Sequence, residues 1–398
     1  MGKMFWSRAV VGVFGVMMLV WSWGGNGHAA EWSVAPAVSV RGVYNSNLLL
    51  FNGNNEVWGY WVSPSMQFKG STESLDVEGN VKSDFVQYYG DQNRSYTNLY
   101  FPLRTSYRWD RYTFGFEGGF TRDNTLMAEL QQTGVVLNFT QRNLWTANPT
   151  WTVGLTERLS WQLGYQYTDA QYENGLSLGL VNYQVHGGSS SMSYQVTERD
   201  QVQLTGDYVR FKTPQIHQRW TYYGAGTSVS HSFTESLAGT VSGGVRFITS
   251  TQDFSGGSLS SHDTVFLFSA KLKQEFEQTT VTLEGSRDIN PSGFGVLVQT
   301  DRIGGIVSHN LTETVTVSID AATYFVDALA STSLTRTFSQ TRFTSVSPKV
   351  SWRFSDWWSL DVAYSYAERA VGDLNQWNFA NSTYVMLTYG GPKWSVSR

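Results

Sequence analysis

The sequence predicts an all-β protein, a transmembrane antiparallel β-barrel with about 18 strands, short periplasmic turns and longer extracellular loops. Three observations lead to this prediction: a recurring turn motif, long segments that alternate apolar and polar residues, and an unusual composition. Aromatic residues make up 15% of the chain, and charged residues also make up only 15%. Soluble domains usually contain about 25% charged residues. The composition therefore suits a wall that shows lipid only every second residue.

The recurring turn consists of Thr-Glu, a polar residue and the first apolar residue of the next strand. It occurs at 72–75, 156–159, 234–237 and 312–315, with a looser copy at 197–200. Related turns at 109–112, 277–279 and 355–358 fill the gaps, so that neighbouring turns lie roughly 35–47 residues apart, a spacing that indicates a structural repeat. Each interval holds a strand, a longer polar loop and a returning strand, which is the pattern of an outer-membrane barrel.

The N-terminus has the features of a secretory signal peptide. Lys3 and Arg8 provide positive charge, and an apolar run follows at 9–23. A retained helical anchor is disfavoured because this run has about 15 residues, short of the ~20 that span a bilayer. Beyond it we find no apolar run long enough to form a spanning helix, which leaves two options, a secreted all-β domain or a barrel that crosses the membrane with strands.

Small residues mark the expected cleavage site of this leader. Gly27 and Ala29 fit positions −3 and −1, so we expect residues 1–29 to be removed, and cleavage after Ala30 is nearly as favourable. Residues 30–398 are then expected to form one outer-membrane barrel domain. Removing Lys3 and Arg8 takes the net charge from −4 to −6, which gives no indication of nucleic-acid binding.

The strand pattern is clearest at 58–69, and 159–168 and 358–366 alternate in the same way. In the first segment one face carries Trp58, Tyr60, Val62, Pro64, Met66 and Phe68, and the other carries Gly59, Trp61, Ser63, Ser65, Gln67 and Lys69. Such segments are longer than the 5–6 residues of soluble strands. They match the ~9–11 residues that a tilted strand needs to cross the hydrocarbon layer. A membrane barrel is therefore favoured over a secreted sandwich or propeller.

Nine outer loops and eight short turns give 18 strands, with 16 as the alternative count. The least regular strand is 182–196, because its apolar face changes from odd-numbered to even-numbered residues, and a β-bulge at Gly187 and Gly188 would account for such a shift of register. The loops near 124–141 and 171–181 are long enough to fold inward as constrictions. The predicted strands are 34–44, 56–69, 74–88, 96–108, 112–123, 142–155, 158–170, 182–196, 200–212, 219–233, 236–249, 263–276, 279–290, 295–310, 314–327, 341–354, 357–369 and 378–389.

The polar strand faces should line the lumen, and they carry charges of both signs near mid-height. Each charge must be hydrated or paired, since an unpaired buried charge is costly. A cross-strand salt-bridge lattice is favoured over a selectivity filter for the individual residues. The candidates are Lys82, Arg104, Arg246, Lys271, Arg302 and Lys349, with Glu78, Asp84, Glu117, Asp207, Glu284 and Asp320.

Enzymatic chemistry finds little support in the sequence. The chain has no cysteine, which excludes disulfides and Cys-ligated metal sites. Five histidines remain after the leader, and no carboxylate lies at a diagnostic spacing from any of them. No HExxH, P-loop or dinucleotide motif is present. We therefore expect no catalytic residues, no metal and no cofactor.

Several short motifs resemble a known family. The segment 35–48 (APAVSVRGVYNSNL), the Ser63-Pro64 strand and the segment 243–247 (GGVRF) resemble outer-membrane β-barrel porins, including barrels found beside exosortase and exopolysaccharide-export systems. The resemblance implies a barrel with a channel or export-accessory role and carries no catalytic residues. The chain departs from the usual barrel end, because a tail at 390–398 follows the last strand. Either the insertion signal is internal or Trp394 belongs to it.

Two functions from different classes follow from these observations. One is a porin-like channel for passive diffusion of small polar solutes across the cell outer membrane. The other is a non-conducting structural barrel, or an accessory to exopolysaccharide export that works with a partner complex. The expected partners are outer-membrane lipid and lipopolysaccharide, the barrel-assembly machinery during biogenesis, and small polar solutes, and a homo-oligomer is compatible with the sequence.

Overall fold

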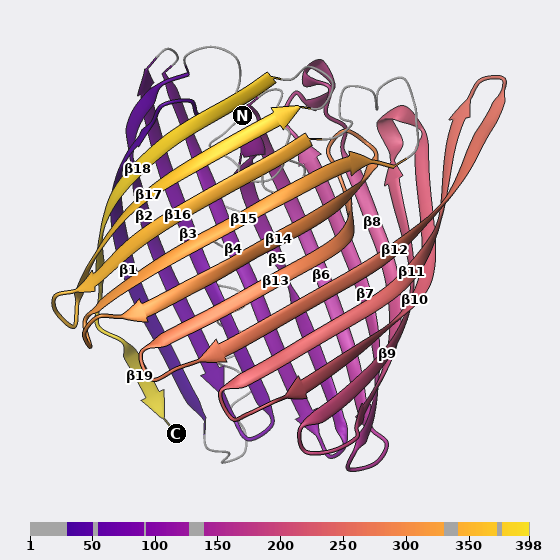
Figure 1. Ribbon diagram of the computed structural model, residues 1–398, viewed down its shortest axis with the longest axis horizontal. Helices are drawn as coiled ribbons and strands as arrows, with labels where there is room; N and C mark the ends of the chain where they lie inside the picture. Colours follow the sequence, from indigo (N-terminus) through magenta and orange to yellow (C-terminus); the bar gives the residue numbers. More distant parts are fainter. Residues whose placement is uncertain are drawn as a thin grey trace.

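The computed structural model describes residues 30–50, 55–90, 93–126, 139–329, 341–371 and 376–397. These residues form one closed antiparallel β-barrel of 18 long strands (Figure 1). β1 closes the barrel by pairing with β2 on one side and, over Ala37–Asn45, with β18 on the other. The expected leader at 1–29 lies outside the described residues.

The strands follow one another around the wall in chain order, and each pairs with its neighbours in the sequence. We call the end with the Thr-Glu turns the turn end and the opposite end the loop end. The strands are β1 (Glu31–Asn45), β2 (Val57–Ser71), β3 (Leu75–Gly90), β4 (Arg94–Trp109), β5 (Tyr112–Asn124), β6 (Gln141–Gly154), β7 (Leu159–Tyr172), β8 (Tyr183–Gln195), β9 (Asp200–Thr213), β10 (Gln218–Ser232), β11 (Leu237–Phe254), β12 (Gly257–Glu275), β13 (Thr279–Pro291), β14 (Leu297–Asn310), β15 (Val315–Ala328), β16 (Thr341–Arg353), β17 (Trp358–Val371), β18 (Gln376–Gly390) and the short β19 (Trp394–Ser397). Two 3-10 helices, η1 (Gly175–Leu178) and η2 (Pro214–Ile216), lie in loop-end connections.

All 18 predicted strands are present, so the expected fold class is confirmed and the alternative count of 16 is wrong. The Thr-Glu turn is explained by one local interaction. The Thr72 hydroxyl accepts a hydrogen bond from the Leu75 amide at 2.9 Å, and the Thr156 hydroxyl accepts one from the Leu159 amide at 3.0 Å. Thr234 and Thr312 make the same bond. A side-chain acceptor thus replaces a backbone partner and tightens the turn.

The outer surface of the barrel is apolar. On β1 and β2 the outward side chains include Val40, Trp58 and Tyr60, which are 50%, 58% and 46% exposed. Their sequence neighbours Arg41, Gly59 and Trp61 face the lumen, so the predicted alternation of 58–69 is confirmed. No helix in the described ranges has the length and apolar character needed to cross a membrane.

The predicted bulge in β8 is wrong. β8 pairs continuously with β7 and β9, and the ladder passes through Gly187 and Gly188 without a shift. Tyr183 and Val185 are 5% and 1% exposed because they face the interior, where apolar groups pack at the loop end. The polarity of the two faces therefore reverses along the strand while its register stays regular, and the sequence pattern alone suggested a shift.

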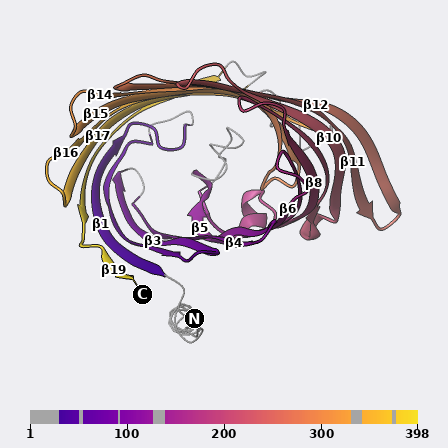
Figure 2. The same ribbon diagram turned by 90° about the horizontal axis from the view of Figure 1, so that it is seen from below.

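The β11–β12 hairpin leaves the wall near the loop end. β12 pairs with β13 only from Phe268 to Glu275, whereas β11 and β12 pair along their full length. Figures 1 and 2 show the hairpin projecting away from the barrel. Both strands are longer than predicted, because the polar residues near Gly257 form a hairpin beyond the membrane-spanning pattern.

The C-terminal tail continues the wall. β19 pairs with the first residues of β1, from Glu31↔Ser397 to Val34↔Trp394, on the same side of β1 as β18. Trp394 therefore lies in an extension of the last strand, with its side chain 61% exposed. The alternative in which Trp394 belongs to the insertion signal stays a prediction.

Candidate functional site

The turn-end half of the lumen is accessible to water. Arg104 on β4 and Glu117 on β5 lie opposite each other and face inward, and their side chains are 69% and 57% exposed. Lys69 and Glu78 on the neighbouring strands are 56% and 49% exposed. Inward side chains with this exposure show that the interior is not filled at this level.

These four residues form a row of alternating charge across β2 to β5. Lys69 Nζ lies 3.0 Å from Glu78 Oε1, and Arg104 Nη2 lies 2.5 Å from Glu117 Oε1. Glu78 is also the ladder partner of Arg104. Because each cation has an acidic neighbour, the row presents strong local dipoles to the lumen and little net charge.

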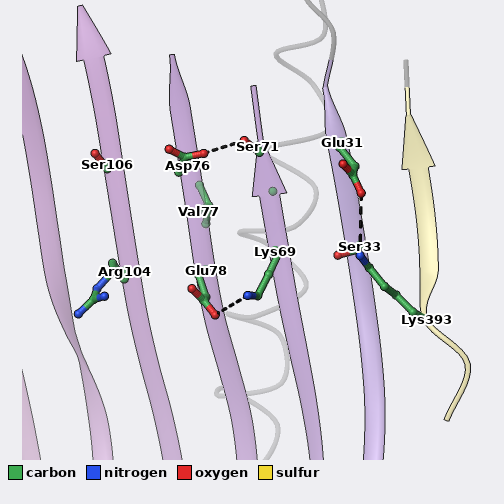
Figure 3. Close-up of a pocket in the computed structure, with 11 residues that line it drawn as sticks. Glu31, Ser33, Lys69, Ser71, Asp76, Val77, Glu78, Arg104, Ser106 and Lys393 are labelled. Atoms are coloured by element: carbon green, nitrogen blue, oxygen red, sulfur yellow. Dashed lines mark hydrogen bonds and ion pairs between the residues drawn. The ribbon is translucent and has the colours of Figure 1, made fainter. Parts of the chain in front are cut away.

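A hollow of about 350 Å³ lies beside this row near the turn end (Figure 3). Asp76 at its rim accepts a hydrogen bond from the Ser71 hydroxyl at 2.7 Å and pairs with Arg108 at 2.8 Å. Lys393, from the segment before β19, reaches within 3.9 Å of Glu31. The C-terminal tail therefore contributes a charged residue to this mouth of the barrel.

A second, more buried ion pair lies about half way around the wall. Arg246 on β11 reaches across β10 to Asp207 on β9, with 2.6 Å between Nη2 and Oδ1. Gly224 on β10 lies between them, and a Cβ there would come within 2.8 Å of the Arg246 side chain and 2.0 Å of the Val245 carbonyl oxygen. The glycine is needed because only a bare backbone lets the arginine cross the strand.

A third pair involves Arg302 on β14 and Glu284 on β13, which are hydrogen-bonded. Arg302 Nε also donates to the Tyr324 hydroxyl at 3.1 Å. Lys271 on β12 is the ladder partner of Glu284. Glu284 thus has cationic neighbours on both adjoining strands, which satisfies the need to compensate a charge on the wall.

The remaining predicted charges behave in two ways. Lys82 pairs with Asp84 at 3.1 Å, and the Asp84 side chain is only 1% exposed. Asp320 and Lys349 face the lumen on β15 and β16, and neither makes an ion pair within the described ranges. The structure therefore brings nine of the twelve candidates into ion pairs, of which the Lys82–Asp84 pair lies within β3 and the others connect different strands. These nine are Lys82, Arg104, Arg246, Arg302, Glu78, Asp84, Glu117, Asp207 and Glu284.

Sequence reasoning missed several cations that face the lumen, among them Lys69, Arg108 and Arg41. Arg41 lies between two aromatic rings, with its guanidinium carbon 4.9 Å from the Trp61 ring centre and 4.5 Å from that of Tyr384. Its charge is stabilised by the ring faces, since cations are attracted to the π-systems of Trp and Tyr. The strand pattern held the signal, because the register of β1 and β2 places Arg41 opposite Trp61.

The loop-end half of the lumen is packed, in contrast to the turn-end half. Inward residues of β8 to β12 form an apolar cluster with the β13–β14 connection, in which Phe211, Trp220 and Leu297 are fully buried. Trp220 Nε1 donates to the Gly295 carbonyl at 3.2 Å. The Val181 amide donates to the Gly293 carbonyl at 2.7 Å, which ties the β7–β8 connection to the same cluster.

The inward-folding loop predicted near 171–181 is therefore present, and it meets the β13–β14 connection inside the barrel. The β1–β2 connection also turns inward, because Leu50 is 2% exposed and packs with Phe343 and Ala380 on the inner wall. Most of the other predicted constriction loop, near 124–141, lies outside the described residues. The lumen thus has an accessible turn-end vestibule and a loop-end constriction.

Among comparisons with protein families, curated proteins and solved structures, the solved structures gave matches. No protein-family model matches the chain, and no curated protein matches it. Among solved structures, OccK5 (OpdH) of Pseudomonas aeruginosa is 11% identical, covers 90% of this chain and 98% of its own, and has a TM-score of 0.45. OccAB3 of Acinetobacter baumannii is 9% identical over 91% of this chain and 99% of its own, with a TM-score of 0.43. OpdK of Pseudomonas aeruginosa, solved with vanillate, is 9% identical over 91% of this chain and 99% of its own, with a TM-score of 0.45.

Proposed function

We propose that the protein is an outer-membrane channel through which small polar solutes diffuse passively. The observation that carries the proposal is the exposure of inward charged side chains in the vestibule, above all Arg104 and Glu117 at 69% and 57%. Barrels of 16–18 strands are wide enough to leave an aqueous channel, whereas ~8 strands are filled by their own side chains. No step of this function needs a catalytic residue or a cofactor.

The geometry supports a passive route with a size limit at the loop end. Paired charges on the wall can hydrogen-bond to a passing solute without holding it, because most of the cations are already compensated by an acid. The apolar cluster around Trp220 and Leu297 narrows the path. We therefore place the size filter at the loop end and the hydrated vestibule at the turn end, which would face the periplasm.

The location and partners belong to the same proposal. The outward apolar belt fits outer-membrane lipid, and the leader at 1–29 would direct the chain through the inner membrane. Barrel-assembly machinery would then insert it. The lumen candidates, including Lys271, Asp320 and Lys349, which make no ion pair in the described ranges, would contact passing ions and solutes.

One observation favours a second candidate, a closed barrel that serves a partner complex. The loop-end cluster contains fully buried residues such as Phe211 and Leu297, as in an ordinary protein core. If that packing closes the path, the vestibule would open only to the turn end. The barrel would then be a structural or export-accessory component.

Solute flux into liposomes separates these two candidates. Liposomes that contain the folded protein should swell in small polar solutes, and the rate should fall as solute size increases, because the constriction limits passage. Protein-free liposomes provide the background rate. Equal swelling rates with and without a correctly folded barrel, for every solute size, would reject the channel and favour the accessory barrel.

A further inference from the structure

Three cations gather on the outward face of β9 and β10 near the loop end. Lys212 on β9 and Arg219 on β10 are direct ladder partners, and Arg210 lies two residues along β9. Side chains on one face of an antiparallel pair stand about 5 Å apart at Cβ, and like charges directly opposite destabilise the sheet. A cluster of this kind needs an anion to compensate it.

The chain supplies little of that compensation. Arg219 contacts Asp253 at 3.5 Å, and no ion pair is found for Arg210 or Lys212 in the described part of the chain. The Nε atom of Arg210 is buried and has no hydrogen-bond acceptor among the described residues. Asp169 on β7 also faces outward, but Gln184 of β8 separates it from Lys212.

Other outward arginines near the loop end are neutralised. Arg122 pairs with Glu173 at 2.6 Å, Arg287 pairs with Asp301 at 2.6 Å, and Arg342 pairs with Glu368 at 3.0 Å. The β9–β10 cluster is different because it has three positive charges and only one acidic contact, Asp253, in the described part of the chain. This contrast within a single rim indicates that the missing anion comes from outside the chain.

The height of the cluster identifies the anion. Tyr208 and Tyr223 are ladder partners that face outward, are 53% and 55% exposed, and lie one row closer to the middle of the barrel than Arg210. Exposed aromatic residues form the girdles of a membrane barrel at the lipid interfaces. Cations just beyond such a girdle lie at the level of lipid headgroups, where planar guanidinium groups bind phosphate in bidentate fashion.

We propose that Arg210, Lys212 and Arg219 bind a phosphate group of a lipid in the outer leaflet, with a phosphorylated glycolipid of the lipid A type as the occupant. The inference rests on the proposed membrane location and is independent of transport through the lumen. His186 on β8, the ladder partner of Arg210, borders the site and is hydrogen-bonded to the Tyr165 hydroxyl at 2.7 Å.

The test measures binding of bisphosphorylated lipid A to the folded protein in neutral detergent by native mass spectrometry. Lys212→Gln combined with Arg219→Gln should weaken binding at least about tenfold, because charge-assisted hydrogen bonds to phosphate are lost. Arg342→Gln is the matched control, since it removes an outward arginine that already has an acidic partner, and it should bind as the wild type does. Fully dephosphorylated lipid A should bind the wild type as weakly as the double variant binds lipid A.

Thermal unfolding gives a second readout, because the expected effect of Lys212→Gln on the unfolding temperature differs between lipid-free and lipid-bound protein. Without lipid, Lys212→Gln should unfold at the same temperature as the wild type or higher, because it removes a like-charge pair. With lipid A, the wild type should gain more stability than the variant. Three results would overturn the proposal. The wild type and the double variant could bind lipid A with equal affinity, or the wild type could bind dephosphorylated lipid A as tightly as lipid A. In the third, millimolar inorganic phosphate would displace bound lipid A. Liposome swelling should be the same for the wild type and Lys212→Gln, so failure of this site and failure of the channel are distinguishable.

Discussion

Leu163→Arg is expected to prevent stable insertion of the barrel. Leu163 is on the outward face of β7, between its ladder partners Trp151 and Ser190. An arginine at the bilayer midplane on the lipid face of a barrel costs about 2–4 kcal/mol. That cost is large because the charge has no water or carboxylate to compensate it in the hydrocarbon layer.

Gln162→Arg is the matched control for this substitution. Gln162 is the adjacent residue, and it faces the lumen between Thr152 and Ser191. An arginine there can be hydrated, so insertion should be retained. Heat-modifiable migration in gels, after refolding into lipid vesicles, reports the inserted fraction of each variant. Equal insertion of the two variants would mean that the faces of β7 have been assigned to the wrong sides.

Trp220→Ala is expected to widen the constriction and to lower stability. The Trp220 side chain is fully buried in the loop-end cluster and donates a hydrogen bond to Gly295. Large-to-small substitution at such a site typically costs 3–5 kcal/mol, part of which reflects the cavity that remains. Because the cavity would lie inside the lumen, water can fill it and the path should become wider.

Single-channel conductance and thermal unfolding together test this prediction. Tyr223→Ala removes an aromatic residue from the same strand on the outward face, and it should leave conductance unchanged. If Trp220→Ala unfolds more easily but conducts as the wild type does, the narrowest point lies elsewhere in the lumen.

The barrel could be predicted from the sequence because its two strongest signals are local. Side-chain alternation sets which face of a strand meets lipid, and the Thr hydroxyl in each turn fixes where strands begin. Residue Arg104 could be placed in the lumen for the same reason. Whether its charge is paired depends on Glu117, a residue on another strand, and the register of β4 and β5 decides that contact.

Loop length indicated where a constriction could form, but the apolar cluster that lines it and the outward cationic cluster could not be predicted in this way. Val185 and Phe211 are apolar residues that face inward, because loops distant in sequence pack over them. Arg210 and Lys212 face outward in the regular alternation of β9, on the same face as Tyr208, beyond the aromatic girdle. Alternation identifies the two faces of a strand, but the environment of each face changes along its length. Only the tertiary arrangement shows where the change occurs.

Single-channel recording of the purified wild-type protein in a planar bilayer tests directly whether the barrel conducts. A water-filled lumen predicts discrete current steps that grow with salt concentration, with weak ion selectivity because most lumen charges are paired. Any selectivity should decrease at 1 M salt, where the screening length falls to ~3 Å. A correctly folded and inserted barrel that passes no current would contradict the channel and leave the closed, partner-dependent barrel.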